Sequence, residues 1–228
     1  MFSTGVTSGH EGRAIAVLAA MESDLSAVRK EADAVGGSFE FNGRPVYQAR
    51  LEGQPMLLAK TGATPEAARA ITQWLVQDRD VSAVVSIGTA GSLTNDLQIG
   101  DIVIARSALR DGNGQNQTSW ELQPVKNCDA KLANTIVTVN AFVASGSERA
   151  RLREVYRADM VDMSAAEIAQ ICATRHRPCV IIREISDRAD EAAPHAFAES
   201  CRRKHPETIQ VTICAVRQLV IDKAKDEN

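Results

Sequence analysis

The sequence lacks the features that would place the protein in a membrane, on a nucleic acid or around a metal ion. Its apolar runs fall short of the ~18 residues that a membrane-spanning helix needs. The formal net charge of −3 gives no basic field for holding a polyanion. The four histidines have no Cys, Asp or Glu partners at metal-ligand spacings. We therefore predict no membrane contact, no nucleic-acid partner and no metal.

Cysteine is also scarce, and its spacing is irregular. The five cysteines are Cys128, Cys172, Cys179, Cys201 and Cys214. We interpret this odd, scattered set as reduced thiols, which predicts a cytoplasmic protein. Residues 1–12 have neither a basic start nor an apolar centre. We expect them to be a disordered leader and not a secretion signal, followed by one domain over residues 13–228.

The remaining chain alternates between strand and helix signals. Residues 14–20 and 81–87 are apolar runs, as in strands buried on both faces. Helices are predicted over residues 65–77 and 165–174, and a closing helix over residues 208–225, where apolar residues form one stripe. This alternation predicts a single α/β domain with a central mixed sheet flanked by helices.

Other segments have less regular signals. Residues 22–35 predict a helix that ends at a Gly-Gly pair, and residues 46–51 and 55–59 predict a hairpin. Residues 136–143 read as a strand. The polar stretch at residues 110–130 is predicted to be a loop that is functional or mobile.

The most informative segment is the apolar run that begins at Cys179 and ends in Ser186-Asp187. A buried strand ending in Ser-Asp places a carboxylate at the carboxyl edge of a sheet, where open α/β folds bind ligands. Burial against apolar neighbours raises the pKa of such a carboxyl group, which suits proton donation. The alternative is that Ser186 and Asp187 only cap a helix that begins near Arg188.

Three further segments stand before this one in the chain. They are Ala20-Met21-Glu22-Ser23-Asp24, Ile87-Gly88-Thr89-Ala90-Gly91-Ser92-Leu93 and Asn140-Ala141-Phe142-Val143. Together with Ser186-Asp187 they resemble the nucleoside phosphorylase/nucleosidase superfamily. Within it, the branch most similar to this chain is the 5'-methylthioadenosine/S-adenosylhomocysteine nucleosidases.

The resemblance implies a fold, a reaction and an assembly. The sheet would be partly curled into a barrel, and the protein would hydrolyse the N-glycosidic bond of a purine nucleoside, with adenine favoured as the base. Asp187 would protonate N7 of the base with the help of Ser186, and Asp24 would position the attacking water. On the residues alone, Asp24 could instead only favour a helix start. The resemblance implies no cofactor, and it implies that the protein forms a homodimer.

By the same resemblance, the nucleoside would contact Thr89, Ala90, Gly91, Phe142, Val143, Met163 and Ser164. Phe142 would stack on the purine, the backbone of Val143 would read the edge of the base, and Met163 would pack under the sugar. Two alternatives stay open. The glycine-rich turn could be only a tight loop, and Phe142 could be a core residue at the end of a strand.

One position departs from the superfamily pattern. Family members carry Glu where this chain has Ser164, and that Glu binds the ribose hydroxyls and steadies the cationic sugar. A Ser cannot supply the charge. Three explanations stand: the sugar differs, Asp162 or Glu184 compensates, or the protein binds a nucleoside without turning it over.

The choice between water and phosphate as nucleophile depends on the turn after the first strand. Phosphorylases of the superfamily hold phosphate there with a Gly-Asp-Pro-Gly-Arg turn, whereas this chain has Ala19-Ala20-Met21. We therefore predict a hydrolase. The alternatives are a phosphate-dependent phosphorylase and a catalytically impaired nucleoside-binding protein. Trp120, Leu122 and Pro124 either form an apolar wall for a 5'-substituent or pack on the protein's own surface.

Overall fold

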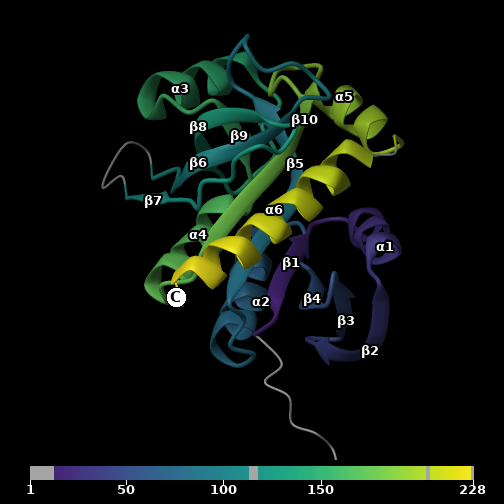
Figure 1. Cartoon of the computed structure of the whole chain (residues 1–228). Coiled ribbons are helices and arrows are strands. Elements are labelled where there is room, and N and C mark those ends of the chain that lie inside the picture. The colour runs from purple at the N-terminus through teal and green to yellow at the C-terminus, as the bar shows by residue number, and fades with distance from the viewer. Residues whose placement is uncertain (1–12, 113–117, 204–205, 227–228) are drawn as a thin grey trace, which may run out of the picture.

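The computed structural model describes residues 13–112, 118–203 and 206–226 (Figure 1). The predicted leader at residues 1–12 lies outside these residues. The strands are β1 (Ile15–Ala19), β2 (Ala34–Phe41), β3 (Arg44–Leu51), β4 (Gln54–Lys60), β5 (Ala83–Ser92), β6 (Ile102–Arg110), β7 (Ser119–Glu121), β8 (Lys131–Thr138), β9 (Met160–Asp162) and β10 (Cys179–Asp187). The helices are α1 (Glu22–Glu31), α2 (Pro65–Gln77), α3 (Gly146–Tyr156), α4 (Ala165–Thr174), α5 (Ala193–Ser200) and α6 (Pro206–Asp226).

Five of the strands close into a ring. β10 pairs with β6, β6 with β8, β8 with β9, β9 with β5, and β5 again with β10. The pairing is mixed, because β10 runs parallel to β5 and antiparallel to β6. From β5 the sheet continues through β1 and β4 to β3 and β2, outside the ring. The predicted single α/β domain with a mixed, partly barrelled sheet is confirmed.

Helices cover both faces of the central strands. Figure 1 shows α6 crossing β10 and β5 on one side, and α6 contacts both strands. Val180 and Ile182 of β10 pack in the same cluster as α6 residues, whereas Ile181 and Ile185 pack with residues of α2 and α4. Successive side chains of a strand point to opposite faces. This alternation determines which side chains of β10 can reach a ligand.

Two predicted elements have different limits in the structure. The helix predicted over residues 22–35 ends at Glu31, and Ala34 already belongs to β2, which pairs antiparallel with β3. The two strands are joined at Asn42-Gly43, both with positive φ (49° and 71°), as two-residue hairpins of this type require. Long-range strand pairing thus overrides the local helix signal. The strand predicted over residues 136–143 is β8, which ends at Thr138.

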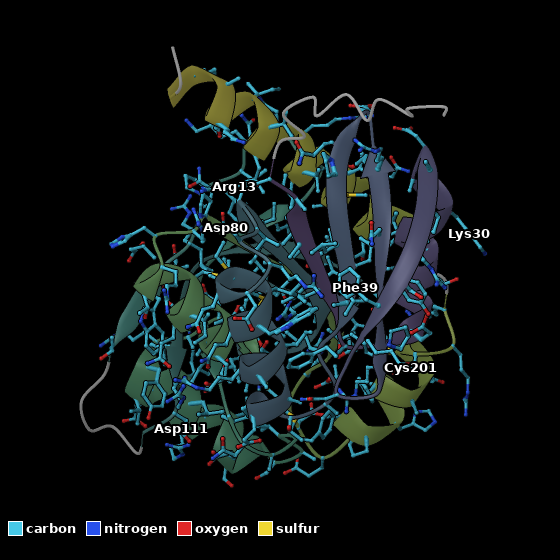
Figure 2. The ribbon with its side chains drawn as sticks, turned by 90° about the horizontal axis from the view of Figure 1, so that it is seen from below. Arg13, Lys30, Phe39, Asp80, Asp111 and Cys201 are labelled. Atoms are coloured by element: carbon cyan, nitrogen blue, oxygen red, sulfur yellow. A yellow bond between two sulfur atoms is a disulfide. The ribbon has the colours of Figure 1, made fainter. Side chains whose placement is uncertain are left out.

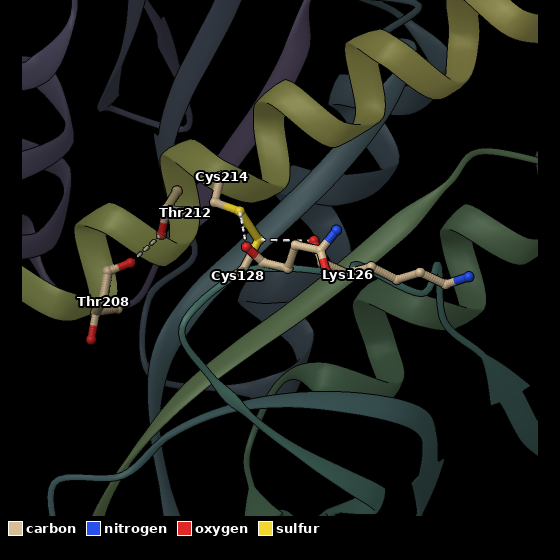
Figure 3. The surroundings of a disulfide bond; sticks show 6 residues. Lys126, Cys128, Thr208, Thr212 and Cys214 are labelled. Carbon is tan, nitrogen blue, oxygen red and sulfur yellow. Dashed lines mark hydrogen bonds between the residues drawn. A yellow bond between two sulfur atoms is a disulfide. The ribbon is translucent and has the colours of Figure 1, made fainter.

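The prediction of reduced thiols is wrong for two cysteines. Cys128 and Cys214 form a disulfide across 86 residues of sequence (Figure 3). The segment before β8 lies against α6, so the two Cα atoms are 5.8 Å apart. Cys172, Cys179 and Cys201 are free. The cytoplasmic location was inferred from reduced thiols, and it stays a prediction.

The described residues contain neither a candidate membrane span nor a candidate metal site. None of the helices in them is long and apolar enough to cross a bilayer. Within these residues there is also no group of three or more His, Cys, Asp or Glu side chains that could hold a metal ion.

The disulfide predicts a measurable gain in stability. Because a cross-link over a long loop restricts the unfolded chain, Cys214→Ser should lower the free energy of unfolding by about 2–4 kcal/mol. Urea unfolding of wild type and variant should differ in oxidising buffer and converge when a reductant is added. Cys201→Ser, which removes an exposed free thiol, is the control. Equal midpoints without reductant would show that the two sulfurs are not joined in solution.

Candidate functional site

A cavity of about 160 Å³ lies where the carboxyl ends of β1, β4, β5 and β10 meet. These four strands run parallel to one another, in the order β4, β1, β5 and β10, and the carboxyl edge of such strands is where α/β folds bind ligands. The cavity is lined by Ala20, Gly62, Ala63, Ile87, Gly88, Thr89, Ala90, Gly91, Phe142, Val161, Asp162, Met163, Ser164, Arg183, Ser186, Asp187 and Phe197.

Larger clefts occur elsewhere on the molecule. One of about 470 Å³ lies at the opposite, amino-terminal ends of β1 and β10, where Arg13 and Arg177 both pair with Asp80. Figure 2 shows Arg13 beside Asp80. Another, of about 590 Å³, is lined by residues of α3 and of the loop after β5. Volume alone does not identify a site. We assign the candidate site to the smaller cavity because it contains a buried carboxyl group with a raised pKa.

That carboxyl group is Asp187, the last residue of β10, with 2% of its surface exposed. Burial raises the pKa of Asp187, and two hydrogen bonds oppose this rise. Ser186 Oγ donates to Oδ2 at 2.7 Å, and the Ala189 N–H donates to Oδ1 at 2.8 Å. Helix α5 begins only at Ala193, so Ser186 and Asp187 do not cap it. The carboxyl group of Asp187 therefore keeps its proton to a higher pH than an exposed aspartic acid does, and the two hydrogen bonds fix its orientation.

Gly91 in β5 makes room for this carboxyl group. A Cβ atom at this position would lie 2.9 Å from Asp187 Oδ1 and 3.1 Å from the Ala189 Cβ. Both distances are shorter than ordinary van der Waals contact. Any larger residue would displace Asp187. Gly91, which was predicted as a ligand contact, is therefore required by the packing of Asp187 and Ala189.

A second polar group in the cavity is a buried ion pair between Arg183 of β10 and Asp162 of β9. Arg183 Nε and Nη2 donate to Asp162 Oδ2 at 3.1 and 2.9 Å, and both side chains are almost fully buried. Ser164 Oγ accepts from Arg183 Nη2 at 3.1 Å and donates to Asp162 Oδ2 at 3.2 Å. Ser164, which stands where the resemblance expects Glu, is therefore hydrogen-bonded to both members of an ion pair with no net charge.

Neither carboxylate that could replace the missing Glu is available. Glu184 follows Arg183 in β10, does not line the cavity, and accepts a hydrogen bond from Thr208 of α6 at 3.4 Å. Both oxygens of Asp162 already accept hydrogen bonds, from Thr138 and the Ala165 N–H among others. Asp162 therefore lines the cavity with both oxygens engaged, and Glu184 lies outside it, so the geometry does not favour compensation by either residue.

Two phenylalanine rings form the apolar side of the cavity. Phe142 lies in the loop after β8 and is 46% exposed, and its ring centroid is 5.5 Å from that of Phe197 in α5. Phe142 is thus not a core residue at a strand end. The neighbouring Val143 is buried with Leu93 and Leu152, and it does not line the cavity.

Asp24 lies apart from the other predicted site residues. It is in the first turn of α1, is 8% exposed, and lines a different cleft together with Lys30 and Arg203. Its negative charge contributes to the raised pKa of the Cys201 thiol, after burial. The structure therefore gathers Thr89, Ala90, Gly91, Phe142, Met163, Ser164, Ser186 and Asp187 around one cavity, and it leaves out Asp24 and the side chain of Val143.

Several lining residues were missed from the sequence. Arg183 carried a usable signal, since a charged side chain inside a buried, mostly apolar strand requires a partner. Gly62 has a φ of 84° and marks the turn after β4. Phe197 gave no such signal, because α5 is a short helix whose position follows from the packing around β10.

Comparison with known proteins decides the family. Residues 14–135 and 130–216 match the phosphorylase superfamily. The chain belongs to this superfamily. The resemblance predicted from the sequence is confirmed.

Solved structures of other phosphorylase superfamily members agree with this assignment. The 5'-methylthioadenosine/S-adenosylhomocysteine nucleosidase of Neisseria meningitidis, in complex with methylthio-immucillin-A, is 26% identical, with a TM-score of 0.82 over 91% of this chain and 100% of that one. The Colwellia psychrerythraea nucleosidase in complex with adenine is 23% identical, with a TM-score of 0.81 over 91% and 96%. The futalosine hydrolase of Helicobacter pylori is 20% identical, with a TM-score of 0.79 over 94% and 100%.

The raised pKa of Asp187 predicts a pH-dependent stability cost. Below the unfolded pKa of about 3.9 the carboxyl group is neutral in both states and costs nothing. As pH rises, the unfolded chain ionises first, so wild type loses stability until the folded pKa is passed. Asp187→Asn should therefore gain stability over wild type as pH rises above about 4, until the folded pKa is passed. Urea unfolding at several pH values tests this, with Asp129→Asn, on an exposed residue, as control. A difference that does not change with pH would contradict it.

Proposed function

We propose that this phosphorylase superfamily member hydrolyses the N-glycosidic bond of a purine nucleoside and releases the free base. The observation that carries the proposal is Asp187, a buried carboxyl group with raised pKa that shares its cavity with the rings of Phe142 and Phe197. An apolar, aromatic wall suits a planar base, and a neutral carboxyl group beside it can donate a proton to a ring nitrogen.

The reaction follows from this arrangement. The base lies against Phe142 and Phe197, and Asp187 donates its proton to N7, with Ser186 holding the carboxyl group in place. The glycosidic bond then breaks with its electron pair moving to the protonated base. Water adds to the anomeric carbon and loses a proton. We assign that proton to Asp24, acting from the first turn of α1 through water, because Ala20, in the short link between β1 and α1, lines the cavity.

Water, and not phosphate, is the proposed nucleophile. Among the described residues that line the cavity, the one cation is Arg183. It is paired with Asp162, and its Nη1 donates to Ser86 and to the carbonyl of Ile182. A phosphate dianion would find no free cation there. The relatives that are named as nucleosidases and hydrolases support the same choice.

Adenine is the proposed base, supported by the relative that was solved with adenine. We also propose a homodimer in the cytoplasm, with the exposed ring of Phe142 covered by the second copy. A second candidate function is nucleoside binding without turnover. Ser164 favours it because Asp162, the carboxylate beside Ser164 among the described lining residues, is already paired with Arg183.

Removing the proton donor tests the mechanism. Asp187→Asn should lower kcat for base release by about 10²–10⁴-fold while nucleoside binding persists. In wild type the rate should fall as pH rises through the raised pKa of Asp187, since only the protonated form acts, and the variant should lack this fall. Asp24→Asn should lower kcat as well, whereas Glu22→Gln, an exposed neighbour on the same turn, should not. Full activity of Asp187→Asn would exclude the assigned role.

Base release from a nucleoside panel tests the reaction class. The panel contains methylthioadenosine, S-adenosylhomocysteine, 5'-deoxyadenosine, adenosine and inosine, with and without phosphate, and mass spectrometry detects free base and free or phosphorylated sugar. We expect free base and free sugar without phosphate. Release that requires phosphate would identify a phosphorylase. Binding without release from any member would identify the nucleoside-binding alternative.

A further inference from the structure

We propose that the sugar end of the cavity selects a deoxynucleoside, whose sugar presents a single hydroxyl, over a ribonucleoside with two adjacent hydroxyls. This inference rests on the proposed function only in taking a nucleoside as the occupant of the cavity. With the base against Phe142 and Phe197, the sugar lies toward Met163, Ser164 and the Arg183–Asp162 pair, which also line the cavity.

The hydroxyl of Ser164 has little capacity left for a ligand. Its one proton is donated to Asp162, and one of its two lone pairs accepts from Arg183. One lone pair remains. Ser164 can therefore accept a hydrogen bond from one sugar hydroxyl, whereas a carboxylate at this position could accept from two.

The ion pair behind Ser164 cannot supply the second acceptor. Asp162 Oδ1 accepts from Thr138 at 2.7 Å and from the Ala165 N–H at 3.2 Å, and Oδ2 accepts from Arg183 and Ser164. Turning Oδ2 to a ligand would break its hydrogen bonds with the buried guanidinium of Arg183, which is strongly unfavourable. Turning Oδ1 would break those from Thr138 and the Ala165 N–H. The pair is also neutral, so it adds no negative charge at the sugar.

A second sugar hydroxyl would consequently face apolar atoms. Met163 and Val161 line the cavity next to Ser164, and the nearest other carboxylate along β10, Glu184, belongs to the α6 face. A hydroxyl buried without a partner loses its hydrogen bonds to water and gains nothing in return. Rejection of an added hydroxyl by a site of this kind is typically about 10–100-fold.

Matched nucleoside pairs measure the selection. The probes are adenosine against 2'-deoxyadenosine and 3'-deoxyadenosine, and inosine against 2'-deoxyinosine. Dissociation constants come from calorimetry and kcat/KM from base release. Wild type should bind and cleave the deoxy member at least about tenfold better. A 2'-deoxy glycosidic bond also breaks more easily in solution, so a higher kcat/KM for the deoxynucleoside is not sufficient evidence of selection. The dissociation constants, and the change in the deoxy-to-ribo ratio of kcat/KM between variants, test the selection.

Two variants of Ser164 separate charge from shape. Ser164→Glu adds a carboxylate with two acceptor oxygens, and it should shift the preference toward the ribonucleoside by at least about tenfold. Ser164→Ala removes the hydroxyl without adding charge, and it should keep the deoxy preference while weakening both ligands. A thermal melt of each variant establishes that it folds. A ribonucleoside preference in wild type, or a ratio that Ser164→Glu leaves unchanged, would overturn the inference.

The outcomes distinguish this inference from the proposed function. Tighter binding of the deoxy members without any base release would refute the proposed hydrolysis and support the selection. Base release with a preference for ribonucleosides would support the hydrolysis and overturn the selection. Failure of all these nucleosides to bind would overturn both.

Discussion

The buried ion pair between Arg183 and Asp162 is the interaction on which the site depends. It joins β10 to β9 across the strand ring, and through Ser86 and Thr138 it reaches β5 and the end of β8. The Ala165 N–H donates to Asp162, so the first turn of α4 is fixed to the same group. Such a pair contributes little net stability compared with a well-packed apolar core, yet breaking it is costly. It therefore fixes the positions of neighbouring elements more than it strengthens the fold.

Sequence reasoning succeeded where a motif ends a strand and the next residues face one cavity. Ser186 and Asp187 were found in this way, because they end a short apolar run whose burial is readable locally. Ser164 was found only through the resemblance to the superfamily. It failed where the partner is distant. Strand β2 forms by pairing with β3, and the disulfide between Cys128 and Cys214 requires the path of α6. Asp24 was assigned by resemblance. The position of its side chain depends on how α1 packs against the chain near Arg203, which the local sequence does not reveal.

The cavity divides into two ends with different electrostatics. At the base end, desolvation raises the pKa of Asp187, and Gly91 leaves the space that this carboxyl group occupies. At the sugar end, charge is present but cancelled, and the hydrogen-bonding groups bind one another. In the proposed reaction, protonation would be concentrated on the base, and the sugar would be held mostly by shape. A site of this kind depends on a good leaving group more than on a stabilised cation.

The alternation of β10 has a consequence for how the charge of the site can change. Arg183 and Glu184 are adjacent, and they point to opposite layers of the fold. A shift of one residue in the pairing of β10 with β5 and β6 would exchange them, placing a carboxylate in the cavity and a guanidinium under α6. The net charge of this cavity therefore depends on strand alignment. A single insertion or deletion before Arg183 that shifted the pairing would change this charge, and it would move the other side chains of β10 to the opposite layer as well.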